Sequence, residues 1–123
     1  KLIVALNKKK IRTSLFINPK LNDIKIAKLT NTRCIELHTG KISRKIKSNN
    51  NYKNELKNIL RCAKFAKSLD IEVHAGHGMD YKTAKILSKI KDIKEFNIGH
   101  FIIGESIFFG LKQVIKKFKK LSK

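Results

Sequence analysis

The feature that most constrains the fold is an alternation of short strand-like stretches with longer amphipathic ones. Four stretches carry the residue pattern of β-strands: 11–17, 33–38, 71–75 and 96–100. Apolar residues at three- and four-residue steps predict helices, of which one precedes the first strand and four follow strands: 2–9, 20–29, 52–69, 81–90 and 111–121. This alternation predicts an α/β fold of right-handed βαβ units with parallel strands.

Two connecting stretches are harder to assign. Residues 41–51 are polar and rich in lysine and asparagine, and their end at 48–51 predicts a loop. Residues 101–109 either continue the fourth strand or form a short helix, and periodicity leaves both open. Asp80 stands just before the helix expected at 81–90, where its carboxylate can accept hydrogen bonds from free amides of the first turn.

Composition narrows the class of protein. The 123 residues fit one partial domain over 1–123, with no linker, and contain no apolar run long enough to span a membrane. Only four of the 29 basic residues behind the net charge of +20 are arginines, and aromatics make up 7%. Specific nucleic-acid recognition favours arginine and aromatic platforms, so no specific nucleic-acid partner is expected.

Cys34 and Cys62 form no paired motif, and we expect reduced thiols in the cytoplasm.

The first residues of the chain have the pattern of a helix that is already under way. Residues 1–7 resemble the later part of an amphipathic helix, and the only methionine is Met79. We therefore expect the sequence to be a piece of a longer protein.

Each expected strand ends in a chemically distinctive corner. These corners are Asn18-Pro19, the segment 36–40, the Gly-His-Gly turn 76–78 and the pair Gly99-His100. Parallel α/β folds bind ligands at the carboxyl ends of their strands, which predicts the functional edge. A flavodoxin-like open sheet and part of a (β/α)₈ barrel are both compatible with these observations.

Two ionisable side chains at this edge are candidates for catalysis. His77 lies between two glycines that let a ligand approach the backbone, and its imidazole can exchange protons near neutral pH. Glu36 shares a strand face with His38, where a carboxylate can stabilise a cationic intermediate. The alternatives are that His77 is a solvated turn residue and that Glu36 pairs with a lysine.

Metal and phosphate binding are two further possibilities at the same edge. The four histidines lie at or near strand ends, yet no metal-ligand spacing is present, so no metal is expected. Gly99 and His100 precede a possible short helix, whose free amides would suit a phosphate group.

The corner motifs resemble those of the pyridoxine 5′-phosphate synthase family. The resemblance rests on four segments in order: Thr13–Pro19 (TSLFINP), Glu36–Gly40 (ELHTG), Ala75–Gly78 (AGHG) and Asn97–Leu111 (NIGHFIIGESIFFGL). It implies a TIM barrel, of which this chain would supply the carboxyl-terminal half, about four βα units. Asn18 and the Ile42-Ser43 pair depart from the usual pattern of the family, and its early motifs have no counterpart here.

The resemblance also implies an activity and residue roles. Family members assemble as homo-oligomers and condense 3-amino-2-oxopropyl phosphate with 1-deoxy-D-xylulose 5-phosphate, without a metal or organic cofactor. His77 would be the proton donor, Glu36 would stabilise the transition state, Gly78 would contact substrate, and Gly99 and His100 would hold the aminooxopropyl phosphate. We expect the chain to need a complementary half-barrel or a second copy, and to be inactive alone. The alternative is an inactive or repurposed half-barrel that binds phosphates or nucleic acid.

Overall fold

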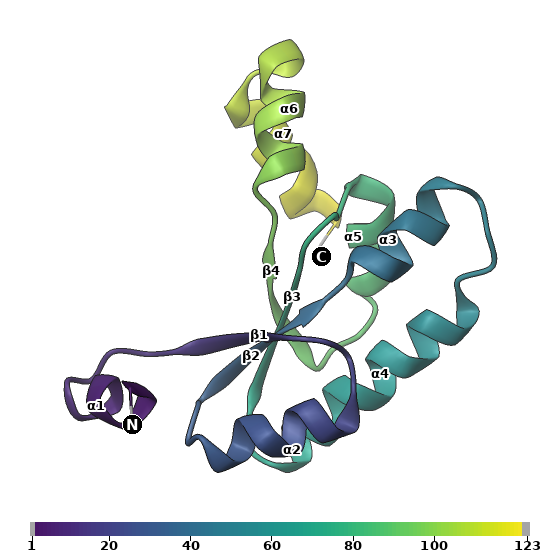
Figure 1. Cartoon of the computed structure of the whole chain (residues 1–123). Helices are drawn as coiled ribbons and strands as arrows, with labels where there is room; N and C mark the ends of the chain where they lie inside the picture. The colour runs from purple at the N-terminus through teal and green to yellow at the C-terminus, as the bar shows by residue number, and fades with distance from the viewer. Residues whose placement is uncertain (1, 122–123) are drawn as a thin grey trace.

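A four-stranded parallel sheet forms the centre of the computed structural model, which describes residues 2–121 (Figure 1). The strands are β1 (Ser14–Ile17), β2 (Cys34–His38), β3 (Glu72–Gly76) and β4 (Ile93–Asn97), and they lie in the order β1-β2-β3-β4. Every strand therefore neighbours the next one in sequence. This singly wound order is that of a partial barrel and excludes the flavodoxin-like order left open by the sequence.

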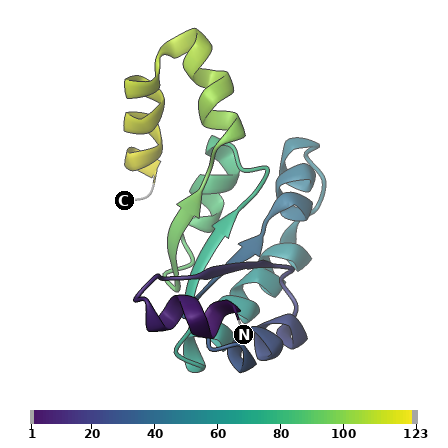
Figure 2. The ribbon, with the colours of Figure 1, turned by 60° about the vertical axis from the view of Figure 1, so that its left-hand side comes forward.

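Helices occupy every connection between the strands. The connecting helices are α2 (Leu21–Leu29), α3 (Gly40–Lys47), α4 (Lys53–Ser68) and α5 (Tyr81–Leu87). Helix α1 (Leu2–Lys8) precedes β1, and α6 (His100–Phe109) and α7 (Leu111–Leu121) follow β4. In Figures 1 and 2, α1 lies off the β1 edge of the sheet, whereas α6 and α7 form an adjacent pair beyond the end of β4. Among residues 2–121, no helix is both long and apolar enough to cross a bilayer.

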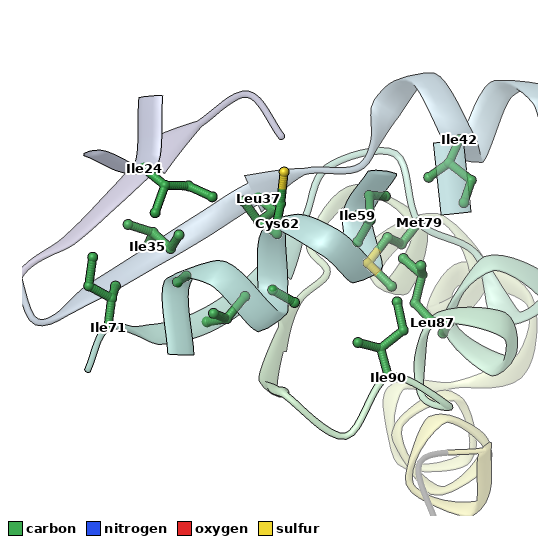
Figure 3. Close-up of a cluster of buried hydrophobic side chains, with 14 of the residues drawn as sticks. Ile24, Ile35, Leu37, Ile42, Ile59, Cys62, Ile71, Met79, Leu87 and Ile90 are labelled. Atoms are coloured by element: carbon green, nitrogen blue, oxygen red, sulfur yellow. The ribbon is translucent and has the colours of Figure 1, made fainter. Parts of the chain in front are cut away.

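One face of the sheet packs against helices to form the core. Ile35 and Leu37 of β2 are fully buried there against Ile24 of α2 and Ile59 of α4 (Figure 3). Because side chains alternate along a strand, Cys34, Glu36 and His38 point to the opposite face. The core thus fixes which side chains of β2 remain available for a site.

Most predicted elements are confirmed, with small shifts of their ends. The three helices following β1, β2 and β3 that were expected from periodicity are α2, α4 and α5, and 111–121 is α7. Asp80 caps α5 as predicted, because its Oδ1 accepts a hydrogen bond of 2.8 Å from the Thr83 amide. The segment 101–109 is helical, which decides the alternative that periodicity left open.

Two predictions were wrong. No helix was expected within the polar connection 41–51, yet α3 ends only at Lys47, since Ile42, Ser43 and Ile46 bury one face while lysines occupy the others. The loop predicted at 48–51 is confirmed. The fourth strand was placed three residues too late: β4 is Ile93–Asn97, with both Lys94 and Glu95 exposed. The start of β4 was missed because Lys94 and Glu95 are charged residues exposed on an edge strand. Gly99 and His100 lie beyond the end of β4.

Glu55 joins α3 to α4 through two lysines. Its Oε1 lies 2.8 Å from Lys45 Nζ and 3.2 Å from Lys41 Nζ, and its side chain is 11% exposed. The hydrogen bond from Lys45 is the main cause that lowers the pKa of Glu55 to about 2, against the opposing effect of burial. The folded state therefore binds a proton at Glu55 less readily than the unfolded state does.

Glu55→Gln is expected to flatten the acid side of the stability profile. Because the folded pKa is depressed, the stabilisation by Glu55 is fully present above about pH 4.3, the usual glutamate value, and is lost as pH falls toward 2. Urea unfolding of both proteins between pH 6 and 2 measures this difference. Glu105→Gln, which removes one negative charge from α6, is the control; equal slopes for wild type and Glu55→Gln would contradict the account.

Candidate active site

The carboxyl ends of β2, β3 and β4 surround a cavity of about 610 Å³. All five site residues expected from the sequence line it: Glu36, His77, Gly78, Gly99 and His100. Glu36 comes from β2, His77 and Gly78 follow β3, and Gly99 and His100 follow β4. The singly wound sheet thus brings together residues that are up to 64 positions apart in the chain.

The turn that carries His77 is held in an unusual backbone conformation. His77 has φ of 76°, in the left-handed region, and Gly78 follows with φ of 73°. The Thr39 hydroxyl lies 2.7 Å from both the Gly76 and the His77 carbonyl oxygens, and the Thr39 amide donates to Gly76. A non-glycine residue in this region is sparse and concentrates at functional sites, so the imidazole is positioned at a local cost in backbone energy.

The imidazole of His77 stacks on that of His38. Their ring centroids are 4.6 Å apart with planes 24° from parallel, and the Phe16 ring lies against both. A Cβ at Gly40 would lie 2.6 Å from Cε1 of His38, so glycine makes room for the pair. Burial, followed by the charges of His77 and Arg44, lowers the pKa of His38 below its usual value. His38 therefore stays neutral at physiological pH beside the candidate proton donor.

Glu36 is hydrogen-bonded to a neutral side chain. The Nδ2 of Asn97 donates to Oε2 of Glu36 over 2.6 Å, and both residues line the cavity. The partner of the carboxylate is therefore an amide and not the lysine considered as an alternative. Asn97 was missed as a site residue because its role depends on β4 lying close to β2, which sequence spacing does not reveal.

The amino terminus of α6 opens on the same cavity. His100 is its first residue, and the first hydrogen bond of its ladder runs from the Ile103 amide to the Gly99 carbonyl oxygen. The backbone amides that come before Ile103 in α6 have no acceptor within the helix, as at any helix start. A Cβ at Gly99 would meet nothing within 4 Å, so this end of the cavity is open. Lys47 of α3 also lines the cavity, and its position was not predicted because no helix was expected there.

A separate polar cluster lies toward the amino ends of the strands. Ligand atoms of Cys34, Glu72 and His74 lie within 4.8 Å of one another. The Arg12 guanidinium occupies this cluster: it donates to Cys34 Sγ at 2.8 Å, contacts Glu72, and lies 2.9 Å from His74 Nε2. Only His74 of the four histidines weighed as metal ligands belongs to it. The negative charge of the Cys34, Glu72 and His74 cluster is balanced by Arg12 of the same chain.

A singly wound parallel sheet with ionisable groups gathered at its carboxyl edge defines a chain of the (β/α)-barrel class. The family model described as "Pyridoxal phosphate biosynthesis protein PdxJ" matches residues 1–123. The chain belongs to this family.

Curated relatives agree with the family match. The chain is 63% identical over 121 residues to the pyridoxine 5′-phosphate synthase of Pelagibacter ubique, which covers 98% of the chain and 51% of the relative. It is 48% identical over 111 residues to that of Zymomonas mobilis, covering 90% and 43%. For Ehrlichia ruminantium the identity is 40% over 119 residues, covering 97% and 48%. The chain spans about half the length of the curated relatives it matches.

Proposed function

We propose that this chain supplies the carboxyl-terminal half of a pyridoxine 5′-phosphate synthase. The reaction condenses 3-amino-2-oxopropyl phosphate with 1-deoxy-D-xylulose 5-phosphate, closes the pyridine ring and releases phosphate and water. The observation that carries the proposal is the lining of one cavity by Glu36, His77, Gly78, Gly99 and His100. Those are the residues to which the motifs of the resemblance assign chemistry, and relatives named for this activity match the chain over nearly its whole length.

The residue roles follow from the demands of ring closure. Imine formation and dehydration require a group that donates protons, and His77 stands at the cavity wall with an imidazole suited to that task. Cationic intermediates are stabilised by a fixed carboxylate, which Glu36 supplies. Both groups come from this chain, and the ring-closing chemistry calls for no metal or organic cofactor.

Phosphate recognition is assigned to the α6 end of the cavity. Gly99 and His100 begin a ten-residue helix, whose terminal amides and dipole favour an anion. Lys47 adds a positive charge at the cavity. The open space beside Gly99 leaves room for the aminooxopropyl phosphate.

The other half of the site is assigned to a partner, in a protein of the cytoplasm. β1 and β4 are the outer strands of the sheet, so both present unpaired backbone groups, and Phe16 is 54% exposed on the face opposite the helices. Helix α6 has no buried residue, and Ile103, Ile107 and Phe108 are each more than 60% exposed. A complementary half-barrel, or a second copy within a homo-oligomer, would cover these surfaces.

A second candidate function is a basic binding module without catalysis. The observation that favours it is the net charge of +20, which promotes non-specific attraction to nucleic acid and phosphate. Such binding would fall steeply with added salt and would be indifferent to His77. Duplex DNA titrated at two salt concentrations against wild type and His77→Ala separates the two candidates.

His100→Ala is expected to weaken binding of 3-amino-2-oxopropyl phosphate by about 10- to 100-fold. This is the range for losing one hydrogen bond to a charged group, about 1.5–3 kcal/mol. The dissociation constant is measured by calorimetry in the barrel reassembled from this chain and the amino-terminal half of a family member. Lys112→Ala, an exposed charge loss on α7, is the control. Equal weakening by the two variants would show that general charge, and not the α6 end of the cavity, holds the phosphate.

A further inference from the structure

Glu36 and Asn97 meet across a strand that separates them. Glu36 is on β2 and Asn97 on β4, with β3 between. The register pairs Glu36 with His74 of β3, whereas Asn97 pairs with Gly76, two residues further toward the carboxyl end. The Glu36 side chain must therefore lean over β3 to accept the 2.6 Å hydrogen bond from Asn97 Nδ2.

Gly76 provides the space for this contact. A Cβ built at Gly76 would lie 2.1 Å from Oε1 of Glu36, 2.9 Å from its Cδ and 2.9 Å from the Asn97 carbonyl oxygen. Any side chain at this position would displace the carboxylate or the β4 backbone. The requirement for glycine is therefore steric, since the Glu36 carboxylate occupies the place of its side chain.

The chemistry of the contact suits a positioning role. An amide N–H donates a directional hydrogen bond to a carboxylate, and an asparagine does so without adding a charge of its own. The other titratable or charged groups that neighbour Glu36 in the sheet or line its cavity are His38 on β2, His74 and His77 from β3 and its turn, Glu95 on β4, His100 on α6 and Lys47 on α3. The neighbouring strand β1 pairs Glu36 with Phe16, which carries no charge. Asn97 is the one among the described cavity-lining residues whose hydrogen bond to Glu36 the structure shows.

We propose that Asn97 is a positioning residue that holds the Glu36 carboxylate aimed into the cavity, with Gly76 as the gap through which the two side chains meet. This inference rests on the proposed function, because it explains how Glu36 is prepared to stabilise a cationic intermediate. It adds Asn97 of β4 and Gly76 of β3 to a site whose stabilising carboxylate, that of Glu36, lies on β2.

The positioning role has a test that needs no activity. The Glu36 side chain is followed by carbon-detected NMR at one fixed neutral pH in wild type, Asn97→Leu and Asn97→Gln. Asn97→Leu removes the donor at similar size and is expected to change the chemical shift of the Glu36 carboxyl carbon, whereas Asn97→Gln keeps an amide donor and is expected to stay closer to the wild-type value. Asn22→Leu, on the exposed face of α2, is the control. A Glu36 carboxyl signal in Asn97→Leu that matches those of wild type and the control would overturn the proposal.

The catalytic consequence is measured separately in the reassembled barrel. Asn97→Leu and Gly76→Ala are expected to lower kcat by about 10- to 100-fold with little change in KM, whereas Asn97→Gln, which keeps the donor, should recover much of the loss. Equal losses in Asn97→Leu and Asn97→Gln, or a rise in KM that matches the fall in kcat, would assign Asn97 a structural role only and overturn the proposal. If wild type shows no turnover, the proposed function fails, and the NMR measurement still decides whether Asn97 positions Glu36.

Discussion

His77→Ala is expected to lower turnover in the reassembled barrel by about 10²–10⁴-fold, the usual contribution of a positioned proton donor. The imidazole lies at the cavity, stacks on a neutral His38 and is held by a turn bonded to Thr39. Removing it leaves Glu36 and the α6 amino terminus in place. Substrate binding should therefore change far less than kcat, and steady-state kinetics with both phosphorylated substrates measures the two separately.

His77→Gly is the matched comparison for the fold. Because φ at this position is 76°, glycine relieves backbone strain that alanine retains. Both variants should lose turnover alike, while thermal unfolding should show the glycine variant to be the more stable of the two. Turnover within a few-fold of wild type in either variant would contradict the assignment of His77 as proton donor.

Leu37→Ala is expected to destabilise the chain by about 2–5 kcal/mol, the range for truncating a buried leucine. Leu37 is fully buried in the middle of β2, where it packs among helix side chains of the core. That cost is a large part of the total stability of a small domain, so much of the variant should be unfolded at room temperature. Urea denaturation followed by circular dichroism measures the change.

Leu29→Ala removes the same atoms from the surface. Leu29 ends α2 and is 83% exposed, so its loss should leave stability within about 0.5 kcal/mol of wild type. A similar loss of stability in the two variants would show that the sheet does not bury its β2 side chains against the helices as described.

Much of the fold could be predicted because its signals are local. Clear periodicity marks the strand that ends at His38 and the helix that follows Asn51. Asp80 is a typical N-cap residue and predicts the start of α5. Helix α3 was missed because only Ile42 and Ile46 mark its buried stripe among lysines. β4 was displaced because its exposed Lys94 and Glu95 resemble a loop. Both errors concern elements with few apolar residues.

The site was predictable in part for a different reason. His77, Gly78, Gly99 and His100 lie at corners where glycine interrupts a pattern, and parallel strands bring such corners together. The support around them was not predictable: the Thr39 hydroxyl, the gap at Gly76 and the Asn97 amide act through contacts between strands. Such contacts depend on register and strand order, which no local spacing encodes.

The central claim is that this chain carries a competent half of a synthase site. The most direct measurement is pyridoxine 5′-phosphate formation from 3-amino-2-oxopropyl phosphate and 1-deoxy-D-xylulose 5-phosphate. It is made with this chain alone and with an added amino-terminal half-barrel from a family member. Product is expected only in the mixture of the two halves. Absence of product in both, with association of the halves demonstrated by sedimentation, would contradict it.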